Sequence, residues 1–331
     1  MDTDILFVSQ LNKPDAICGV GILGNLIADT LAKSKKYNVI KLLTEDPNEV
    51  VEHYNKYKPS IVLYNFNRVS APWMMDQTWR KHIKAIEAIV YHEYDVQVNF
   101  DPADWYNFKY AIVHDPLAKE NGRLFSVQRL MPPYSPSKPF QKPSIPTIGF
   151  QGQMVACKGL DAVVKQVQSE FDHALIRVHA PDFRFGEGSE EYQKNLKAMY
   201  DAIHKPGIKI DYMTDIKTDQ EIVDFLSENT INCYFYWYNA GCGLASSLDF
   251  ALAAKRPFAI TQSFMFRHFW DLEPSNLIHK NSLRQIISFG LEPYKKFYED
   301  YTEENVIAGY ERAFDTMISK RVSFSSSQFL I

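Results

Sequence analysis

The first 130 residues carry short apolar runs that end in polar residues, separated by segments in which apolar residues recur at helical spacing. A run of this kind is typical of a buried parallel strand that leads into a loop. Strands that alternate with helices predict a mostly parallel sheet, whose ligands bind at the carboxyl ends of the strands. The expected strands are residues 4–9, 38–43, 60–65, 87–93 and 110–115, and the expected helices are residues 25–32 and 48–57.

A proline-rich stretch, MPPYSPSKPFQKPSIP at residues 131–146, suits an extended linker rather than a helix or a strand. The alternation of strands and helices then starts again, which predicts a second α/β domain. We expect domains at residues 1–140 and 141–300, and a C-terminal helix and tail at 301–331 for which a return to the first domain is one option. The expected strands of the second half are residues 147–152, 174–179, 208–212, 231–236 and 257–261, with helices at 159–167, 191–204, 219–227, 244–254 and 302–319.

Composition narrows the classes of function. The net charge of −4 gives no general attraction for phosphate backbones, so a nucleic-acid partner would need a local basic patch. The first residues are acidic where a secretory signal is basic, and no apolar stretch is long enough to span a bilayer, so we expect a cytoplasmic protein. The four cysteines are scattered, and no His, Cys and Asp cluster has ligand spacing, so we expect reduced thiols and no metal.

Residues 149–161, GFQGQMVACKGLD, form the first stretch that carries chemistry. A predicted strand ends there in a glycine-bounded turn, and Lys158 with Gly159 opens the next helix. Glycines let backbone amides approach a diphosphate, and a lysine beside them neutralises a phosphate leaving group. The alternative for Lys158 is a solvated lysine at the start of a helix.

Residues 236–257, YWYNAGCGLASSLDFALAAKRP, form the second stretch, a strand end, a loop and a helix that ends in a turn at Pro257. Together the two stretches resemble the donor domain of retaining GT-B glycosyltransferases. The resemblance implies two Rossmann-like domains that face a central cleft, a nucleotide-diphosphate sugar such as a UDP-sugar as co-substrate, and no further cofactor. The acceptor would be a hydroxyl of a glycan, a lipid-linked molecule or another compound.

The resemblance also assigns site residues. It implies catalytic roles for His92, at the end of a strand, and for Lys158. From their places at strand ends of the first domain, we expect Asn65 and Asn67 to reach an acceptor hydroxyl, and His114 and Asp115 to lie in the wall of the cleft. The residues implied for binding the donor and its diphosphate are Gly19, Gly21, Gly152, Gln153, Lys158, Gly243, Ala245, Ser246, Ser247 and Arg267.

Several positions have their own alternatives. The Gly19-Val20-Gly21 sequence is also compatible with a plain tight turn, and Gly24 is expected to pack a helix closely. A packed or solvent-facing imidazole is the usual alternative for a lone histidine, and at the carboxyl end of a strand we weigh it equally with a functional role for His92. In the aromatic run from Tyr234 to Tyr238, half of the rings are expected in the core, which leaves Trp237 or Tyr238 to stack on a ligand.

The sequence departs from the family pattern in the donor domain. Gln153 stands where the family has a cationic arginine, and Cys242 and Phe250 stand where many members have two glutamates. Asp249 is one residue away from the second of these positions. We hypothesise that Arg267 supplies the cation that is missing at Gln153.

We therefore expect a glycosyltransferase, and the resemblance implies that it acts with retention of anomeric configuration. Loss of both glutamates leaves open a non-catalytic protein of the same fold that binds a sugar nucleotide or a partner. A glycosyltransferase of modified DNA bases is a further alternative, and it would need a basic groove around Arg80, Lys81 and Lys84. An NAD-dependent enzyme fits worst, because the first loop lacks G-x-G-x-x-G in register with an acidic residue. No oligomeric state follows from the sequence.

Overall fold

The computed structural model describes residues 3–11, 19–68, 70–98, 100–181 and 189–327. It divides into two compact units: unit 1 comprises Met1–Leu130 and Tyr301–Ile331, and unit 2 comprises Met131–Asp300. The division thus falls at the start of the proline-rich segment rather than after residue 140. Ser137 donates hydrogen bonds to the Asp224 carboxylate from its backbone N–H and its hydroxyl, at 2.7 and 2.8 Å, which attaches this segment to unit 2.

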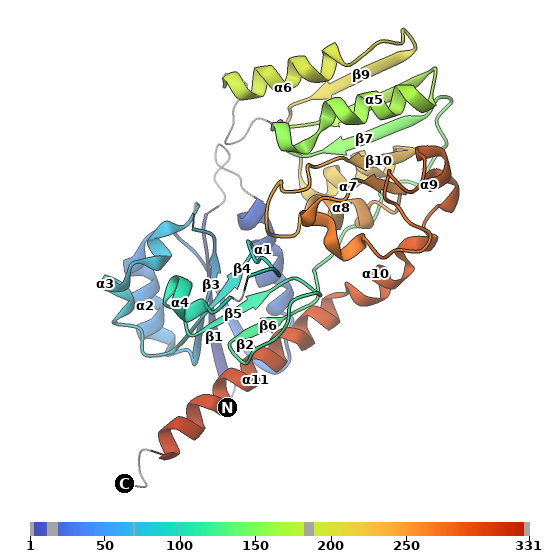
Figure 1. The fold of residues 1–331 in the computed structure, drawn as a ribbon. Coiled ribbons are helices and arrows are strands. Elements are labelled where there is room, and N and C mark those ends of the chain that lie inside the picture. Colours follow the sequence, from blue (N-terminus) through green and yellow to red (C-terminus); the bar gives the residue numbers. More distant parts are fainter. Residues whose placement is uncertain (1–2, 12–18, 69, 99, 182–188, 328–331) are drawn as a thin grey trace. The chain divides into compact units, whose positions relative to one another are not determined.

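Unit 1 is built on a six-stranded, all-parallel sheet with the order β2-β1-β3-β4-β5-β6 (Figure 1). The order changes direction between β1 and β3, so the crossovers that follow these strands leave to opposite sides. The elements are β1 (Thr3–Ser9), α1 (Gly19–Leu31), β2 (Tyr37–Leu43), α2 (Pro47–Tyr57), β3 (Ile61–Phe66), the 3-10 helix η1 (Pro72–Met75), α3 (Gln77–Arg80), β4 (Ile86–Tyr91), α4 (Pro102–Tyr106), β5 (Tyr110–Val113), β6 (Leu124–Ser126) and α11 (Glu303–Ser327).

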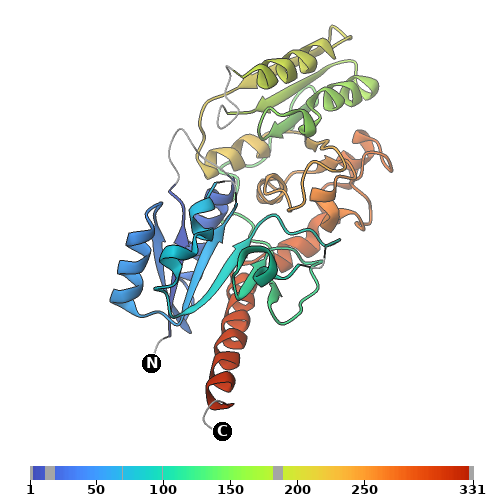
Figure 2. The same cartoon turned by 60° about the vertical axis from the view of Figure 1, so that its left-hand side comes forward.

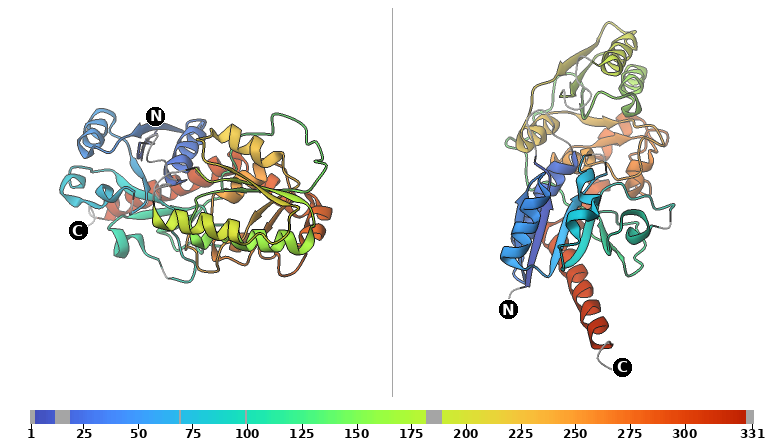
Figure 3. Two further views of the ribbon diagram at one scale, coloured as in Figure 1. Left: turned by 90° about the horizontal axis from the view of Figure 1, so that it is seen from above. Right: turned by 90° about the vertical axis from the view of Figure 1, so that its left-hand side faces the viewer.

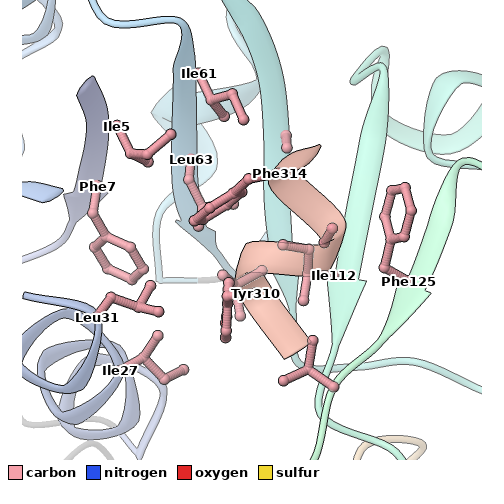
Figure 4. Close-up of a cluster of buried hydrophobic side chains, with 14 of the residues drawn as sticks. Ile5, Phe7, Ile27, Leu31, Ile61, Leu63, Ile112, Phe125, Tyr310 and Phe314 are labelled. Carbon is pink, nitrogen blue, oxygen red and sulfur yellow. The ribbon is translucent and has the colours of Figure 1, made fainter. Parts of the chain in front are cut away.

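The central strands of unit 1 are buried on both faces, as their continuous apolar runs predict. Successive side chains of a strand point to opposite faces of the sheet, so they pack in two separate hydrophobic cores. Phe7 and Leu63 pack with α1 and α11 on one face, as Figure 4 shows, whereas Val8 and Val62 pack with α2 on the other. The layers of helix, sheet and helix can be followed in Figure 2.

The long helix α11 belongs to unit 1, and Figure 3 shows it running along that sheet. Tyr310 and Phe314 bury their rings in the core, and Lys36 pairs with Asp315 at 2.6 Å. His114 fixes the helix from the sheet side, because its Nδ1 donates to the Gln128 carbonyl at 2.8 Å and its Nε2 accepts from the Tyr310 hydroxyl at 2.8 Å. The helix continues to Ser327, past the expected end at residue 319, and the last four residues of the predicted tail lie outside the described residues.

Unit 2 contains a five-stranded, all-parallel sheet with the order β11-β10-β7-β8-β9 (Figure 1). Its order changes direction between β10 and β7. The elements are β7 (Thr147–Gln151), η2 (Ala156–Lys158), α5 (Leu160–Glu170), β8 (Ala174–His179), α6 (Glu190–Asp201), β9 (Ile208–Met213), α7 (Asp219–Ser227), β10 (Ile231–Tyr234), α8 (Ser247–Ala253), β11 (Phe258–Ile260), η3 (Phe264–Phe269), α9 (Leu283–Phe289), η4 (Glu292–Tyr294) and α10 (Lys295–Asp300).

The sequence predicted most strands to within two residues, and the fold class is confirmed as α/β with two Rossmann-like sheets. Capping side chains define where helices α7 and α9 begin, because Thr218 and Ser282 each form a capping box with the residue three positions later. Among the described residues, no helix combines the length and the apolar character that crossing a bilayer would require.

Gly149 lets two asparagines lie directly against β7. A Cβ atom at residue 149 would be 2.0 Å from Asn229 Nδ2 and 2.2 Å from Asn232 Oδ1, distances at which atoms overlap. These two amides are buried and bonded to each other at 2.9 Å, and Asn229 also donates to the Phe225 carbonyl. The absence of a side chain at residue 149 therefore permits the polar network that joins α7 to the sheet.

We expect Gly149→Ala to lower the free energy of unfolding by about 1–3 kcal/mol, because the added methyl group must displace a bonded asparagine. Urea denaturation followed by circular dichroism measures the change. Gly241→Ala is the control, because its new Cβ would meet only the flexible Met265 thioether, at 3.2 Å or more. Equal unfolding midpoints for Gly149→Ala and the wild type would contradict this packing.

Burial makes unit 1 sensitive to acid. Desolvation, followed by the charge of Arg129, lowers the pKa of His114 to about 3, whereas an unfolded histidine titrates near 6.5. Below about pH 6.5 the unfolded state binds a proton that the folded state refuses, so stability falls as the pH drops from this value toward 3, by up to about 1.4 kcal/mol per pH unit for this group.

We therefore expect His114→Asn to reduce the loss of unfolding free energy between pH 7 and pH 5, measured by urea denaturation at both values. Tyr310→Phe removes the hydroxyl contact but retains the histidine, and it should keep the wild-type pH dependence. The same pH dependence in His114→Asn and in the wild type would show that His114 is not a buried neutral imidazole.

Candidate functional site

The two sequence stretches of unit 2 meet at the carboxyl edge of its sheet. Strands β7 and β10 are hydrogen-bonded neighbours, and each stretch follows or includes the end of one of them. The backbone N–H of Trp237 donates to the Cys157 carbonyl at 2.8 Å, which holds the two segments against each other. This is the point at which the strand order reverses, where open α/β sheets bind their ligands.

Lys158, Tyr236 and Ser247 form a cluster at this point, here called the lysine cluster. The Lys158 ammonium nitrogen lies 3.7 Å from the centre of the Tyr236 ring, and the Tyr236 hydroxyl is 3.0 Å from Ser247 Oγ. No carboxylate pairs with Lys158 among the described residues, and its side chain is partly exposed. A ring face attracts a cation without neutralising its charge, so the ammonium remains able to bind an anion.

Two backbone amides that the sequence assigned to a diphosphate are used within the protein. The N–H of Gly152 donates to the His179 carbonyl at 3.1 Å, and that of Ala245 donates to the Met265 carbonyl at 3.2 Å. Helix α8 begins at Ser247, after Gly243 and Ser246, rather than at residue 244. We expected the backbone N–H groups of Gly152 and Ala245 to bind a diphosphate. In the structure both donate to backbone carbonyls of the protein instead.

Arg267 holds the loop of the second stretch in place. Its Nη1 donates to the Cys242 and Phe264 carbonyls at 2.7 and 2.8 Å, and its guanidinium lies 4.5 Å from the centre of the Phe264 ring. The side chain is buried, as is that of Asp249 in α8. Arg267 is therefore not exposed as a cation that could replace the one missing at Gln153. Asp249 is likewise not exposed as a carboxylate that could replace a missing glutamate.

Two large aromatic side chains are exposed beside the lysine cluster. Trp237 and Tyr238 have 55% and 58% of their surface accessible, unlike Tyr236, which is 1% accessible. Tyr238 stacks on Trp270, with ring centres 6.3 Å apart and planes 22° apart. Exposed aromatic faces next to a cation suit a ligand that has both a ring and a negative charge.

In unit 1, polar side chains meet at the point where the order of the strands reverses. His92 follows β4, and its Nε2 is 2.6 Å from Asn65 Oδ1. The Asn65 amide nitrogen donates to Ser9 Oγ and to the Val20 carbonyl, both at 3.0 Å. Desolvation, followed by the charges of His114 and Arg129, lowers the pKa of His92 to about 3, so its imidazole is neutral at pH 7.

The structure corrects the expectations for the asparagines and the first glycines. Asn65 is fully buried and so cannot contact an acceptor, and Asn67 accepts from the backbone N–H of Ser70 at 3.0 Å in a turn. Gly19 and Gly21 lie in the first turn of α1 rather than in a loop. The helix-packing role predicted for Gly24 is confirmed by its close approach to Asn65.

The basic residues that the sequence suggests for a nucleic-acid groove lie near the amino edge of the unit 1 sheet. Arg80, Lys81 and Lys84 line a hollow near the amino ends of β4 and β5, whereas His92 follows the carboxyl end of β4. Arg80 is also bonded to the Glu87 carboxylate at 2.8 Å. A nucleic acid held at this hollow would be far along the strands from His92.

The sequence did not identify Tyr236 and Ser9 as site residues. The alternation of the aromatic run is compatible with a core position for Tyr236, and this side chain is indeed buried, but its ring also lies under the Lys158 ammonium, which the pattern does not predict. The one feature of the sequence that could have indicated Ser9 as a site residue is its position at the end of the first strand. Among the described residues, no group of three His, Cys, Asp or Glu side chains could hold a metal ion.

No protein-family model matches the chain, and the search of curated protein sequences found no match. Solved structures do match in fold. HepE of Anabaena, solved with UDP and glucose, has a TM-score of 0.57 at 11% identity, covering 98% of this chain and 100% of its own. Sucrose-phosphate synthase of Thermosynechococcus elongatus gives 0.55 at 12% identity, covering 99% and 98%.

The UDP-forming trehalose-phosphate synthase of Burkholderia xenovorans, solved with glucose-6-phosphate, gives a TM-score of 0.54 at 9% identity, covering 99% of each chain. These similarities extend over both units and almost the full length of each protein. At such low identity they establish the fold alone. The chain therefore has the GT-B fold, in agreement with the resemblance of its two sequence stretches.

Proposed function

We propose that the protein is a glycosyltransferase that transfers a sugar from a nucleotide-diphosphate sugar to an acceptor hydroxyl. The observation that carries the proposal is the lysine cluster at the reversal point of the unit 2 sheet, where no carboxylate of the described residues pairs with the ammonium. Lys158 comes from the first stretch, and Tyr236 and Ser247 come from the second. The geometry thus joins the two segments whose resemblance suggested the activity.

The chemical role follows from the charge that develops in the reaction. When the bond between the sugar and the diphosphate breaks, negative charge builds up on the leaving oxygen. A positioned ammonium stabilises that charge more in the transition state than in the bound donor, which is the condition for faster chemistry. Lys158 is held for this role by the Tyr236 ring and by the 3-10 helix η2 in which it lies.

We further propose UDP-sugars as donors and a sugar hydroxyl as acceptor, because the proteins of similar fold were solved with UDP, UDP-glucose or glucose-6-phosphate. His92, neutral and partly exposed, is the group of unit 1 that we propose contacts the substrate. The sequence resemblance implies retention of configuration, which the anomeric coupling constant of the product would reveal by proton NMR.

A second candidate is a protein that binds a sugar nucleotide without turning it over. Cys242 and Phe250 replace two carboxylates of related enzymes, and the neighbouring Asp249 is buried. Incubating the pure protein with UDP-glucose, and measuring UDP release with and without a panel of sugar acceptors, separates the candidates. Saturable binding of UDP-glucose without UDP release would favour the binding protein.

We expect Lys158→Met to weaken UDP binding by about tenfold to a hundredfold, because one charge-assisted contact to phosphate is lost. Isothermal titration calorimetry with UDP measures the change, and uridine, which lacks phosphate, should bind equally to both proteins. Lys165→Met is the matched control, since Lys165 is exposed and paired with Asp161 on α5. An unchanged affinity for UDP in Lys158→Met would remove the basis of the proposal.

We also expect Trp237→Ala to weaken UDP binding by roughly fivefold to a hundredfold, because an exposed indole that stacks on a base contributes about 1–3 kcal/mol. Titration calorimetry gives the affinity, and quenching of the wild-type indole fluorescence by UDP reports the contact directly. Tyr200→Ala, at a ring on α6 that is 43% accessible, is the control. UDP affinity that is the same in Trp237→Ala and the wild type would show that the base binds elsewhere.

A further inference from the structure

A hollow at the amino edge of the unit 1 sheet gathers basic side chains that the proposed function does not use. Its volume is about 580 Å³, within the range of sites that bind small ligands. We call it the basic hollow, and the charged residues among those that line it are Arg80, Lys81, Lys84, Glu87, Lys109 and Arg123.

The order of the sheet explains why these cations lie together. Lys84, Lys109 and Arg123 come one or two residues before β4, β5 and β6. These three strands are parallel neighbours in the sheet, so their amino ends lie side by side at one edge. Segments that are distant in the sequence thus bring positive charge to one place.

Arg80 is a fixed and buried cation of the basic hollow. Its Nε donates to the Glu87 carboxylate at 2.8 Å, and its Nη2 donates to the Asn107 carbonyl at 3.0 Å. The guanidinium also lies 3.8 Å from the centre of the Phe108 ring, and the side chain is only 4% exposed. Among the described residues, none accepts a hydrogen bond from its Nη1. Buried N–H groups normally have an acceptor, and an anionic oxygen bound in the hollow would supply one.

The lysines of the basic hollow are available to a ligand. Lys81 and Lys84 are exposed, and in the part of the chain that the structure describes no carboxylate pairs with either of them. The Lys84 ammonium donates to the Lys81 carbonyl at 3.0 Å, and an ammonium group has three hydrogens, so it can still bind other acceptors. Lys109 adds a third ammonium group from another segment.

The acids near the hollow are already engaged. The Glu87 carboxylate accepts from Arg80 and from the Tyr64 hydroxyl, the latter at 3.0 Å. Asp101 pairs with Arg123 at 3.1 Å. The lysines therefore form a local excess of positive charge in a chain whose net charge is −4.

We propose that the basic hollow is a binding site for a phosphate monoester carried by a soluble molecule, separate from the site for the sugar donor. A phosphate monoester has close to two negative charges at neutral pH and three terminal oxygens. It can therefore accept from Arg80 and from more than one ammonium group at the same time. A carboxylate has one charge and two oxygens, so it would balance less of the positive charge.

The surroundings favour a soluble phosphate over a phospholipid headgroup. Proteins that lie on a membrane usually combine basic residues with apolar side chains that enter the bilayer. Ile83 and Phe108, the large apolar residues of the hollow, are only 6% and 1% exposed. Among the described residues, no exposed large apolar side chain lines the hollow. A bilayer would be held by charge alone, whereas a small phosphate ester fits into the hollow beside Arg80.

The test is a titration of the full-length protein with glycerol 3-phosphate at neutral pH and low ionic strength, followed by phosphorus-31 NMR. We expect saturable binding that Lys81→Gln/Lys84→Gln weakens by about tenfold to a hundredfold, because charge-assisted contacts to phosphate are lost. Lys35→Gln/Lys119→Gln is the matched control, since it removes equal charge from exposed lysines of unit 1 outside the hollow. The same affinity in the wild type and in the first double variant would overturn the site.

The role of Arg80 is tested without a risk to folding. In wild-type protein labelled with nitrogen-15, the guanidinium signals of Arg80 should shift as glycerol 3-phosphate saturates the site. Glycerol, which lacks the phosphate, should leave them in place. Arg80 signals that do not move at saturation would contradict its place in the site.

A second comparison separates this site from the proposed donor site. Lys158→Met should bind glycerol 3-phosphate as the wild type does, and Lys81→Gln/Lys84→Gln should bind UDP as the wild type does. If Lys158→Met alone abolishes the binding of glycerol 3-phosphate, the phosphate binds in unit 2 and the inference is wrong. The inference does not depend on the proposed function, because the titration needs neither UDP nor turnover.

The last comparison identifies the source of the phosphate. Vesicles of phosphatidylcholine and phosphatidic acid present the same glycerol phosphate group on a bilayer, and sedimentation measures how much protein they bind. We expect glycerol 3-phosphate to bind, and we expect the wild type and Lys81→Gln/Lys84→Gln to sediment equally with the vesicles. Sedimentation that this double variant loses, without binding of glycerol 3-phosphate, would assign the site to a lipid headgroup and overturn the soluble source.

Discussion

The reversal of strand order is the constraint on which the rest of this structure depends. In a parallel sheet all strands end at one edge, and where the crossovers leave to opposite sides the ends of two strands remain uncovered by either helix. Unit 1 has this point at β1 and β3, and unit 2 has it at β10 and β7. The polar residues that the proposed function uses lie at these two points or at the neighbouring strand end.

The two units fill this position with different chemistry. In unit 1 the buried Asn65 amide bridges the strands, and a buried polar group is stable only when its hydrogen bonds are satisfied. Ser9, Val20 and His92 satisfy them. In unit 2 the corresponding group is the Tyr236 ring. The Lys158 ammonium lies over its face, and its hydroxyl is hydrogen-bonded to Ser247.

The sequence predicted the fold well because strand and helix periodicities are local. It placed Lys158 correctly after a strand, and it recognised Gly24 as a packing residue. It could not predict the partners of polar side chains, since these come from segments far apart in the chain. Asn65 resembles an exposed residue at a strand end until Gly24 and Val20 are seen to cover it, and Arg267 resembles a ligand-binding cation until its two carbonyl acceptors are known.

The described residues provide no carboxylate partner for Lys158, and this affects its proposed role. An acid close to this lysine would compete with a phosphate for the ammonium, and a bound ligand would have to displace it. In the described part of unit 2 the lysine instead rests on the Tyr236 ring, which orients the charge without neutralising it. Because Arg267 is committed to its loop and Gln153 is uncharged, the charge stabilisation that we propose would fall to Lys158, whereas the GT-B pattern that the sequence resembles has two cations. The substitutions that weaken the resemblance to the family therefore make the proposed activity depend more strongly on this one side chain.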